Sequence, residues 1–378
     1  MKTMRQSIGY LALSLAFAVM FLLCGNIKVK AAGTGTVTVD VEKFSIGQGY
    51  LIEPEQITFQ DGETFAQVFD RFIKKHGYTY THDGTLTSSF YLRSIDNADT
   101  GKLNIPLCVQ AMPSYEYGGE TVSPPTNINN TGNIEFPTLG EFAYSRQSGW
   151  MYFVNNNAPN VGFSEWKVKN GEVIRVQFTV YGLGADLGAK YGEDSVALSL
   201  PDRNEATKKM AIMNNYPSCF ENDVWKAAYN KAKSVISDFD SSVSDVVSAT
   251  KTLPSEQEII KWISDKQKAE EAAQKAALVK KYTPAKTTLK FVKKTGTKKV
   301  KLTWKKVKDA SGYEIYMSTK KSSGYKKIKT IKKAKRVTFA KSGLKKKKTY
   351  YFKVRTYRTV NGVTYYGSYS NVKKVKIK

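Results

Sequence analysis

The 378-residue sequence predicts a multidomain protein in which an α+β domain, an all-α helical segment and an all-β sandwich follow one another. Alternating strands surround one strongly amphipathic helix in the first half of the chain. Helical patterns then occupy residues 203–283, and short alternating strands recur at regular spacing after residue 284. A chain of this length is sufficient for two or three domains.

The first 32 residues have the pattern of a signal peptide. Lys2 and Arg5 precede an apolar run over residues 11–23, and Ala31-Ala32 supplies the small residues of a cleavage site. The run is shorter than the ~20 apolar residues of a membrane-spanning helix. No second apolar run of that size follows. We therefore expect a secreted chain without a transmembrane segment after cleavage.

Residues 33–190 have the pattern of a compact α+β domain. Alternating residues over 37–44 predict a strand with one buried face, and a second short strand is expected over 56–59. Large apolar residues over 65–73 share one helical face. They predict a core helix that ends near Gly77.

The second half of this domain contains an insertion followed by further strands. Residues 101–140 are rich in Pro, Gly and Asn, and a loop of this length in a compact domain is usually functional or disordered. Residues 150–154 are apolar on both faces, which predicts a central strand. Strands are also expected over 163–168 and 174–180, with a hairpin turn at Asn170-Gly171 between them.

Residues 203–283 have helical patterns throughout. Short helices are expected around residues 224–235 and 243–249. A longer helix over 256–281 is rich in Ala, Glu, Gln and Lys, and Pro284 ends it. We expect this segment to act as a helical spacer.

Residues 284–378 combine a β-sandwich pattern with an extreme charge. Strands are expected around 300–304, 313–316 and 350–354, separated by turns rich in Lys, Gly and Ser. The segment contains 31 Lys and Arg residues against two acidic residues, a net charge of +29. The rest of the chain sums to about −3. Charge segregated in this way favours a polyanionic partner for this end of the chain.

Several motifs of this last segment resemble those of one family. They are Leu302-x-Trp304, Gly312-Tyr313-x-Ile315-Tyr316, Leu344 followed by Tyr350-x-Phe352-x-Val354, and Tyr366-Gly367-Ser368-Tyr369-Ser370-Asn371. As a set they resemble the fibronectin type III domain, including its tyrosine corner. The resemblance implies an all-β sandwich and no particular activity.

A second group of motifs falls within residues 33–190. They are Gln60-Asp61-Gly62-Glu63-Thr64, Ser148-Gly149-Trp150-Met151-Tyr152-Phe153-Val154-Asn155, Val161-Gly162-Phe163 and Lys169-Asn170-Gly171-Glu172-Val173-Ile174. They resemble the transcobalamin C-terminal-like domain, a β-grasp-like module common in secreted Gram-positive proteins. In transcobalamin the equivalent domain closes over cobalamin against a large helical barrel. Residues 203–283 are too few to build such a barrel.

The resemblance also implies where a ligand would bind. The positions are Trp150, Tyr152, Asn155, Asn156, Asn157 and Trp166. A cobalamin-like ligand is one alternative, and another small molecule or a glycan is a second. Core packing of Trp150 and Tyr152, and turn formation by the asparagines, explain the same residues without a ligand.

Two basic runs are the candidate polyanion-binding residues. They are Lys332, Lys333, Lys335 and Arg336, and Lys345, Lys346, Lys347 and Lys348. Lys outnumbers Arg by 28 to three after residue 284, which favours diffuse, salt-sensitive attraction over bidentate recognition. Export excludes intracellular nucleic acid as the partner. An anionic cell-wall polymer, anionic phospholipid or host glycosaminoglycan remains, as does a charged face that is only solvated.

The sequence contains no recognised catalytic motif. His76 and His82 do not have the spacing of metal ligands, so no metal site is predicted. Two cysteines alone do not decide whether Cys108 and Cys219 form a disulfide. We therefore expect a protein that is not an enzyme and has no resident cofactor.

These patterns together predict a secreted binding protein associated with the cell surface of a Gram-positive-type bacterium. The first domain would carry a ligand or partner surface, and the basic domain would attach to an anionic cell-wall polymer. A corrinoid-binding protein is one alternative. A host-glycan adhesin or an accessory module of a polysaccharide-degrading system is another.

Overall fold

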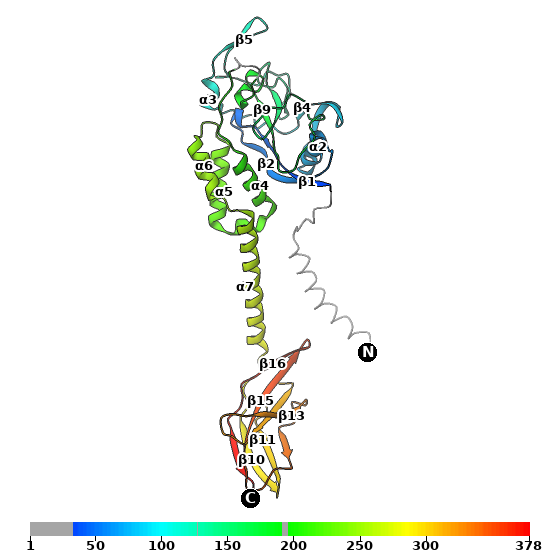
Figure 1. Cartoon of the computed structure of the whole chain (residues 1–378), viewed down its shortest axis with the longest axis vertical. Helices are drawn as coiled ribbons and strands as arrows, with labels where there is room; N and C mark the ends of the chain where they lie inside the picture. Colours follow the sequence, from blue (N-terminus) through cyan, green and yellow to red (C-terminus); the bar gives the residue numbers. More distant parts are fainter. Residues whose placement is uncertain (1–32, 127, 191–195) are drawn as a thin grey trace. The chain divides into compact units, whose positions relative to one another are not determined.

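The computed structural model describes residues 33–126, 128–190 and 196–378. The chain divides into two compact units, the first ending at Ile263 and the second beginning at Ser264 (Figure 1). The predicted signal peptide lies outside the described residues. Within the described ranges, no helix is long and apolar enough to cross a membrane. The predicted fold class is confirmed, with a mixed α/β region, then helices, then all-β sheets.

The first unit is built on a four-stranded sheet of order β2-β1-β9-β8. Its strands are β1 (Thr34–Glu42), β2 (Tyr50–Gln60), β8 (Gly149–Val154) and β9 (Val173–Thr179). The two central strands, β1 and β9, are parallel, and the outer pairs are antiparallel. A parallel central pair flanked by antiparallel strands and covered by a helix is the β-grasp arrangement that the sequence resemblance implied.

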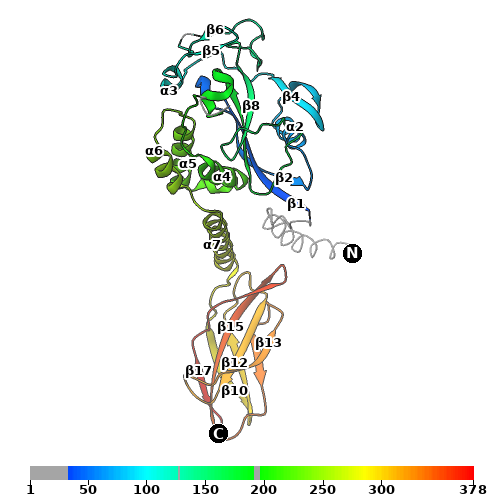
Figure 2. The ribbon, with the colours of Figure 1, turned by 45° about the horizontal axis from the view of Figure 1, so that its top comes forward.

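Helix α2 (Phe65–Lys75) supplies the apolar layer on one side of this sheet. Its start is fixed by a capping box, in which the Thr64 hydroxyl accepts a hydrogen bond from the Gln67 amide at 3.2 Å and the Gln67 side chain accepts one from the Thr64 amide at 2.9 Å. Its aromatic residues, such as Phe69, are fully buried. Figure 2 shows α2 and α4 on opposite sides of β1 and β2.

The other face of the sheet is polar and nevertheless buried. Strand β1 places Asp40 and Glu42 there, and both are at most 1% exposed. Helix α4 (Asn204–Asn215) covers this face, and Arg203 at its start lies 3.5 Å from the Glu42 carboxylate. The prediction that the strand over 37–44 is only half-buried is therefore wrong, because the helices that follow cover its polar side.

Smaller elements surround the main sheet. They are β3 (Tyr80–Thr85), β4 (Ser88–Ile95), β7 (Leu139–Gly140), α3 (Leu107–Gln110), β5 (Tyr115–Tyr117), β6 (Glu120–Val122) and the 3-10 turns Phe44–Ile46, Gly182–Leu187 and Pro217–Glu221. The predicted insertion at 101–140 therefore contains a short helix and a β5–β6 hairpin instead of one long loop. The strand predicted over 163–168 is a turn, from which Phe163 packs on Phe65 with ring centroids 5.0 Å apart.

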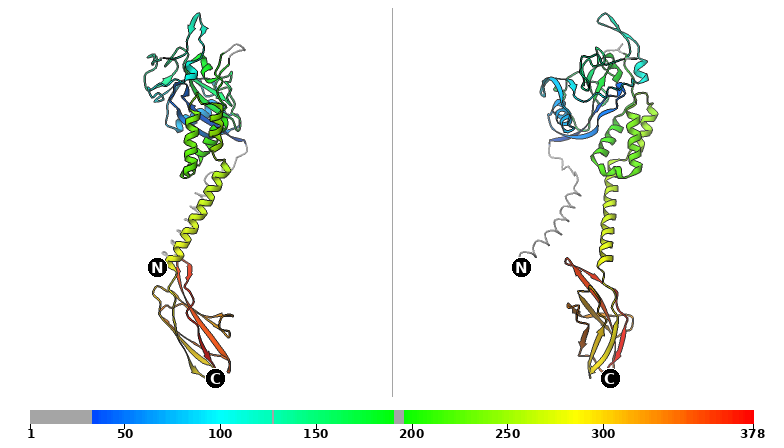
Figure 3. Two further views of the ribbon diagram at one scale, coloured as in Figure 1. Left: turned by 90° about the vertical axis from the view of Figure 1, so that its left-hand side faces the viewer. Right: turned by 180° about the vertical axis from the view of Figure 1, so that it is seen from behind.

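Helices occupy residues 204–282, as predicted. After α4 they are α5 (Asp223–Ile236), α6 (Val243–Thr252) and α7 (Glu256–Tyr282), and Figure 3 shows α4, α5 and α6 packed together. Buried residues such as Met210, Ala232 and Val246 join the core of the sheet. Only residues 268–281 of α7 are exposed throughout, so the term spacer fits this stretch alone.

The second unit contains two antiparallel sheets, of order β10-β11-β14 and β13-β12-β15-β16, with β17 beside β15. The strands are β10 (Leu289–Gly296), β11 (Lys299–Trp304), β12 (Gly312–Ser318), β13 (Lys326–Ile331), β14 (Thr338–Lys341), β15 (Thr349–Val360), β16 (Val363–Tyr366) and β17 (Lys373–Lys376). The Tyr350 hydroxyl accepts a hydrogen bond from the Lys345 amide at 3.0 Å, which forms the expected tyrosine corner. The region has the fibronectin type III-like fold predicted for it.

Candidate functional site

Trp150 and Tyr152, the two rings expected beside a ligand, lie in the core of the first unit. They are 5% and 6% exposed. The Trp150 indole donates to the Leu139 carbonyl at 2.9 Å, and the Tyr152 ring stacks on Phe65 with centroids 5.3 Å apart. Because protein groups already contact these rings, ligand stacking by either residue would require the core to open. Their ligand-binding role stays a prediction that this packing does not favour.

The asparagines at positions 155–157 form the turn after β8. Asn155 and Asn156 have φ values of 49° and 71°, a left-handed conformation that asparagine tolerates. The Asn155 side-chain oxygen accepts from the Val173 amide at 3.0 Å. The Asn156 amide group donates to Asp202 at 2.7 Å. These side chains hold the turn against neighbouring segments, which is the interpretation that needs no ligand.

Trp166 lies apart from the two buried rings, in the loop before β9. Its indole nitrogen donates to the Glu172 carboxylate at 3.2 Å, and the Lys169 ammonium lies 5.8 Å from its ring centroid. The ring is half-buried. The candidate ligand residues therefore occupy a core, a turn and a loop, and they do not line one cavity.

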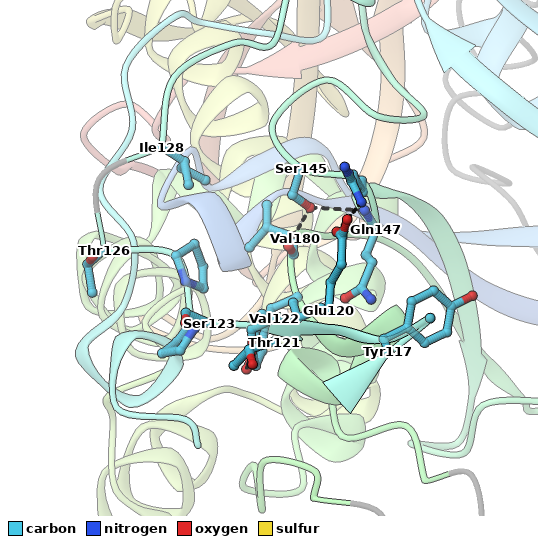
Figure 4. A pocket seen from close by; sticks show the side chains of 15 residues that line it. Tyr117, Glu120, Thr121, Val122, Ser123, Thr126, Ile128, Ser145, Gln147 and Val180 are labelled. Carbon is cyan, nitrogen blue, oxygen red and sulfur yellow. Dashed lines mark hydrogen bonds and ion pairs between the residues drawn. The ribbon is translucent and has the colours of Figure 1, made fainter. Parts of the chain in front are cut away.

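A pocket of about 470 Å³ lies elsewhere in the first unit, where the insertion meets the end of β9 (Figure 4). Its lining comes from the β5–β6 hairpin, residues 123–126 and 128, the loop 145–147 and residues 180–181. Three segments far apart in the sequence thus form one site. The composition of 101–140 predicted a loop that is either functional or disordered, and no sequence signal indicated which residues it would meet.

Gln147 is the buried polar side chain of this pocket, with an exposed fraction of 7%. Its side-chain oxygen accepts from the Gly182 amide at 3.0 Å and from the Tyr115 hydroxyl. These donors fix the orientation of the amide group. Its Nε2 has no hydrogen-bond partner among the described residues. An unmet buried donor costs about 1–3 kcal/mol, so an acceptor reaching this atom would be favoured.

The rest of the lining combines apolar surface with a charged rim. Val122, Pro124 and Ile128 give the apolar part, and the hydroxyl of Tyr181 donates to the Pro113 carbonyl at 2.6 Å. At the rim Arg146 forms an exposed ion pair with Glu120. Pockets of this size and polarity suit a small organic ligand. Among the residues that the structure describes, no group of three His, Cys, Asp or Glu side chains could hold a metal ion.

Cys108 and Cys219 are separate free thiols in this structure. Burial, together with the neighbouring Asp240 carboxylate, raises the pKa of Cys108 to about 12. Burial raises the pKa of Cys219 to about 11. At neutral pH both groups therefore stay protonated, and neither has the thiolate character of a nucleophile.

The candidate polyanion-binding residues are all exposed on the second unit. The run 345–348 lies beside the last strand, since the Lys347 amide donates to the Ile377 carbonyl at 2.8 Å. The run 332–336 follows β13, whose last residue pairs with the first half of β12. The opposite end of β12 pairs with the start of β15, next to the run 345–348. The two runs therefore lie at opposite ends of the sandwich.

The described chain thus combines a β-grasp sheet that carries a pocket with a basic β-sandwich. Residues 137–180 match a domain of unknown function, DUF4430, which is transcobalamin-like. This segment includes β8, β9 and the pocket loop 145–147. The match confirms the transcobalamin-like resemblance for that part of the chain. No curated protein matches the chain.

Solved structures similar to the C-terminal region include fibronectin type III domains. One is titled FN3tt mut, with 20% identity, covering 25% of this chain and 96% of that chain at a TM-score of 0.21. The sixth fibronectin type III domain from human fibronectin type III domain containing protein 3 is 16% identical. The match covers 25% of this chain and 85% of that chain, with a TM-score of 0.22. An Fn3-like protein from Clostridium thermocellum is 23% identical. The match covers 24% of this chain and 86% of that chain, with a TM-score of 0.19.

Proposed function

We propose that this protein is an exported, envelope-associated binding protein that the basic sandwich attaches to an anionic cell-wall polymer. The observation that carries the proposal is the segregation of charge, +29 after residue 284 against about −3 in the rest of the chain. Mutual repulsion of these cations is relieved when a fixed polyanion lies beside them. The leader pattern of residues 1–32 supports an extracellular setting.

The first unit would then present the ligand surface. The pocket around Gln147 supports this role, since it combines an apolar lining with a buried donor that has no described partner. A small molecule or a glycan end that carries a hydrogen-bond acceptor fits this lining. A corrinoid ligand, suggested by the transcobalamin-like segment, is the alternative that titration of the protein with cobalamin tests directly.

Salt fractionation of the producing cells tests the attachment. We expect the protein on the wall in low salt and in the medium after a wash at about 1 M salt, where the Debye length is roughly 3 Å. A variant with K345Q, K346Q, K347Q and K348Q should be released at lower salt than the natural protein. The matched control replaces four exposed lysines of the first unit, namely K102Q, K226Q, K231Q and K251Q. A surface pool that resists molar salt would contradict the electrostatic attachment.

A host-glycan adhesin is distinguished by specificity rather than by charge. Retention of the protein on immobilised heparin at salt concentrations that elute it from a plain cation exchanger would favour the adhesin. Equal elution from the two supports agrees with diffuse attraction to any anionic polymer.

A further inference from the structure

The outer face of the five-stranded sheet in the second unit alternates tyrosine rings with cations. Five side chains form this row, which we call the cation–tyrosine ladder: Tyr325, Lys353, Tyr369, Arg355 and Tyr366. Lys353 and Arg355 lie two residues apart on β15 and therefore point to the same face. The core side of the strand carries buried Phe352 and Val354 instead.

Each cation of the ladder lies between two rings. The Lys353 ammonium is 3.7 Å from the centroid of the Tyr369 ring and 4.3 Å from that of Tyr325. The Arg355 guanidinium is 3.9 Å from the Tyr366 centroid and 5.3 Å from that of Tyr369. These contacts fix the rings and cations relative to one another, and the side chains remain half-buried or exposed.

One acidic residue partly balances the ladder. The Glu314 carboxylate pairs with Arg355 at 2.7 Å and with Lys327 at 2.8 Å. Burial alone would raise its pKa, but hydrogen bonds from Lys327, Tyr316 and Arg355 hold the pKa of Glu314 below its ordinary value, so it stays ionised. Within residues 284–378, Lys353 forms no salt bridge, and its charge stays available to an anion.

The ladder connects the two basic ends of the sandwich. Strand β15 starts directly after the run 345–348. Tyr313, which pairs with the last residue of β13, also pairs with Thr356 of β15, so the run 332–336 lies near the far end of the ladder strand. The distance along β15 from Thr349 to Thr356 is roughly 23 Å at 3.3 Å per residue. A polymer several units long could contact both ends and the ladder at once.

We propose that the cation–tyrosine ladder binds an anionic polysaccharide, with the sugar rings packed on the tyrosines and the acidic groups beside Lys353 and the basic ends. Aromatic rings add apolar contact area that a chain of bare phosphates cannot use, whereas pyranose rings present flat C–H faces. This inference rests on the proposed function, because it specifies the chemistry of the polyanion that the sandwich would hold.

Binding of the purified protein to two polymers tests the ladder. Polygalacturonate carries one carboxylate on each sugar ring, and linear polyphosphate carries charge without rings. We expect the double change Tyr325→Ser with Tyr369→Ser to weaken polygalacturonate binding roughly tenfold at fixed salt. Polyphosphate binding should stay unchanged, because no cation is removed. Tyr325→Phe with Tyr369→Phe keeps both rings and should bind polygalacturonate like the natural protein.

Two further measurements separate the outcomes. Tyr91→Ser, at a tyrosine of the first unit that is 45% exposed, should leave both affinities unchanged, and thermal unfolding shows whether each variant is folded. If the two serine changes weaken the binding of both polymers equally, or change neither affinity, the proposed role of the ladder is wrong, although the protein still binds polyanions. Failure of the natural protein to bind either polymer overturns the proposed function itself.

Discussion

The two units place their charges in opposite ways. The first unit has almost balanced charge and buries several acidic and basic side chains beneath α4, among them Glu42, Arg175 and Arg203. In the second unit, residues 284–378 carry a net charge of +29 and expose nearly all of it, with Glu314 as the buried charged residue. Apolar side chains such as Trp304 and Phe352 fill its core.

This difference indicates two roles for charged residues. In the first unit they pair with one another inside the fold, and in the second unit they remain available to a binding partner. In the first unit each buried cation meets a fixed group: Arg175 Nε lies 3.4 Å from Glu42, and Arg175 donates to Asn156 at 2.8 Å. Burial and the neighbouring Glu42 carboxylate raise the pKa of Asp40 well above its ordinary value. Substitutions should therefore act on stability in the first unit and on binding in the second.

The largest effect is expected from Arg175→Met. The change leaves the Glu42 carboxylate buried with less compensation, so the free energy of unfolding of the first unit should fall by about 3–5 kcal/mol. Hydrogen exchange of the β9 amides measures it, with the β12 amides as the internal control. Arg175→Met with Glu42→Leu should cost less than Arg175→Met alone. A loss below about 1 kcal/mol would show that the buried pair contributes little to the fold.

The second prediction concerns pH and Asp186, which is fully buried. Burial raises its pKa to about 7, although hydrogen bonds from Thr179 and the Val180 amide oppose the rise. In the unfolded chain the pKa is about 3.9, so the unfolded state releases a proton that the folded state keeps. The contribution of Asp186 to stability is therefore lost as pH rises from about 4 to about 7, by about 4 kcal/mol in total.

Unfolding of the natural protein and of Asp186→Asn across this pH range checks the assignment. The difference in free energy of unfolding between the two proteins should change steadily with pH and level off above pH 7. A difference that is constant with pH would assign the titration to other groups.

A smaller effect is expected from Tyr350→Phe in the second unit. The Lys345 amide loses its acceptor, which should lower the free energy of unfolding by about 1 kcal/mol. The β12 amides should exchange faster and the β9 amides should not. An equal response of both sets would mean that the two units unfold as one.

The smallest stability effect is expected from the four changes K345Q, K346Q, K347Q and K348Q. Exposed cations contribute little to the fold, so the free energy of unfolding should change by less than about 0.5 kcal/mol at physiological salt. At low salt the variant should be slightly more stable than the natural protein, because repulsion among the lysines is reduced. Destabilisation comparable with that of Arg175→Met would remove the contrast between the two units.

Local patterns predicted several elements well. Helix α2 follows from its single apolar face, and the sandwich strands follow from alternation and the tyrosine corner at Tyr350. The prediction of a strand over 163–168 is wrong. These residues form a turn, from which Phe163 packs on Phe65 and the Trp166 indole donates to Glu172. Residues 150–154, expected as a central strand because they are apolar on both faces, form the edge strand β8, and of the expected ligand residues Trp150 and Tyr152 are packed in the core.

The sequence by itself determined the order of the parts and where the net charge lies, because both depend on composition and short-range periodicity. Only the tertiary structure decided that α4 covers the polar face of β1 and that Gln147 lies beneath the β5–β6 hairpin. It alone placed Lys353 between two tyrosines. These arrangements join residues far apart in the chain, and their energies arise only when folding brings the partners together.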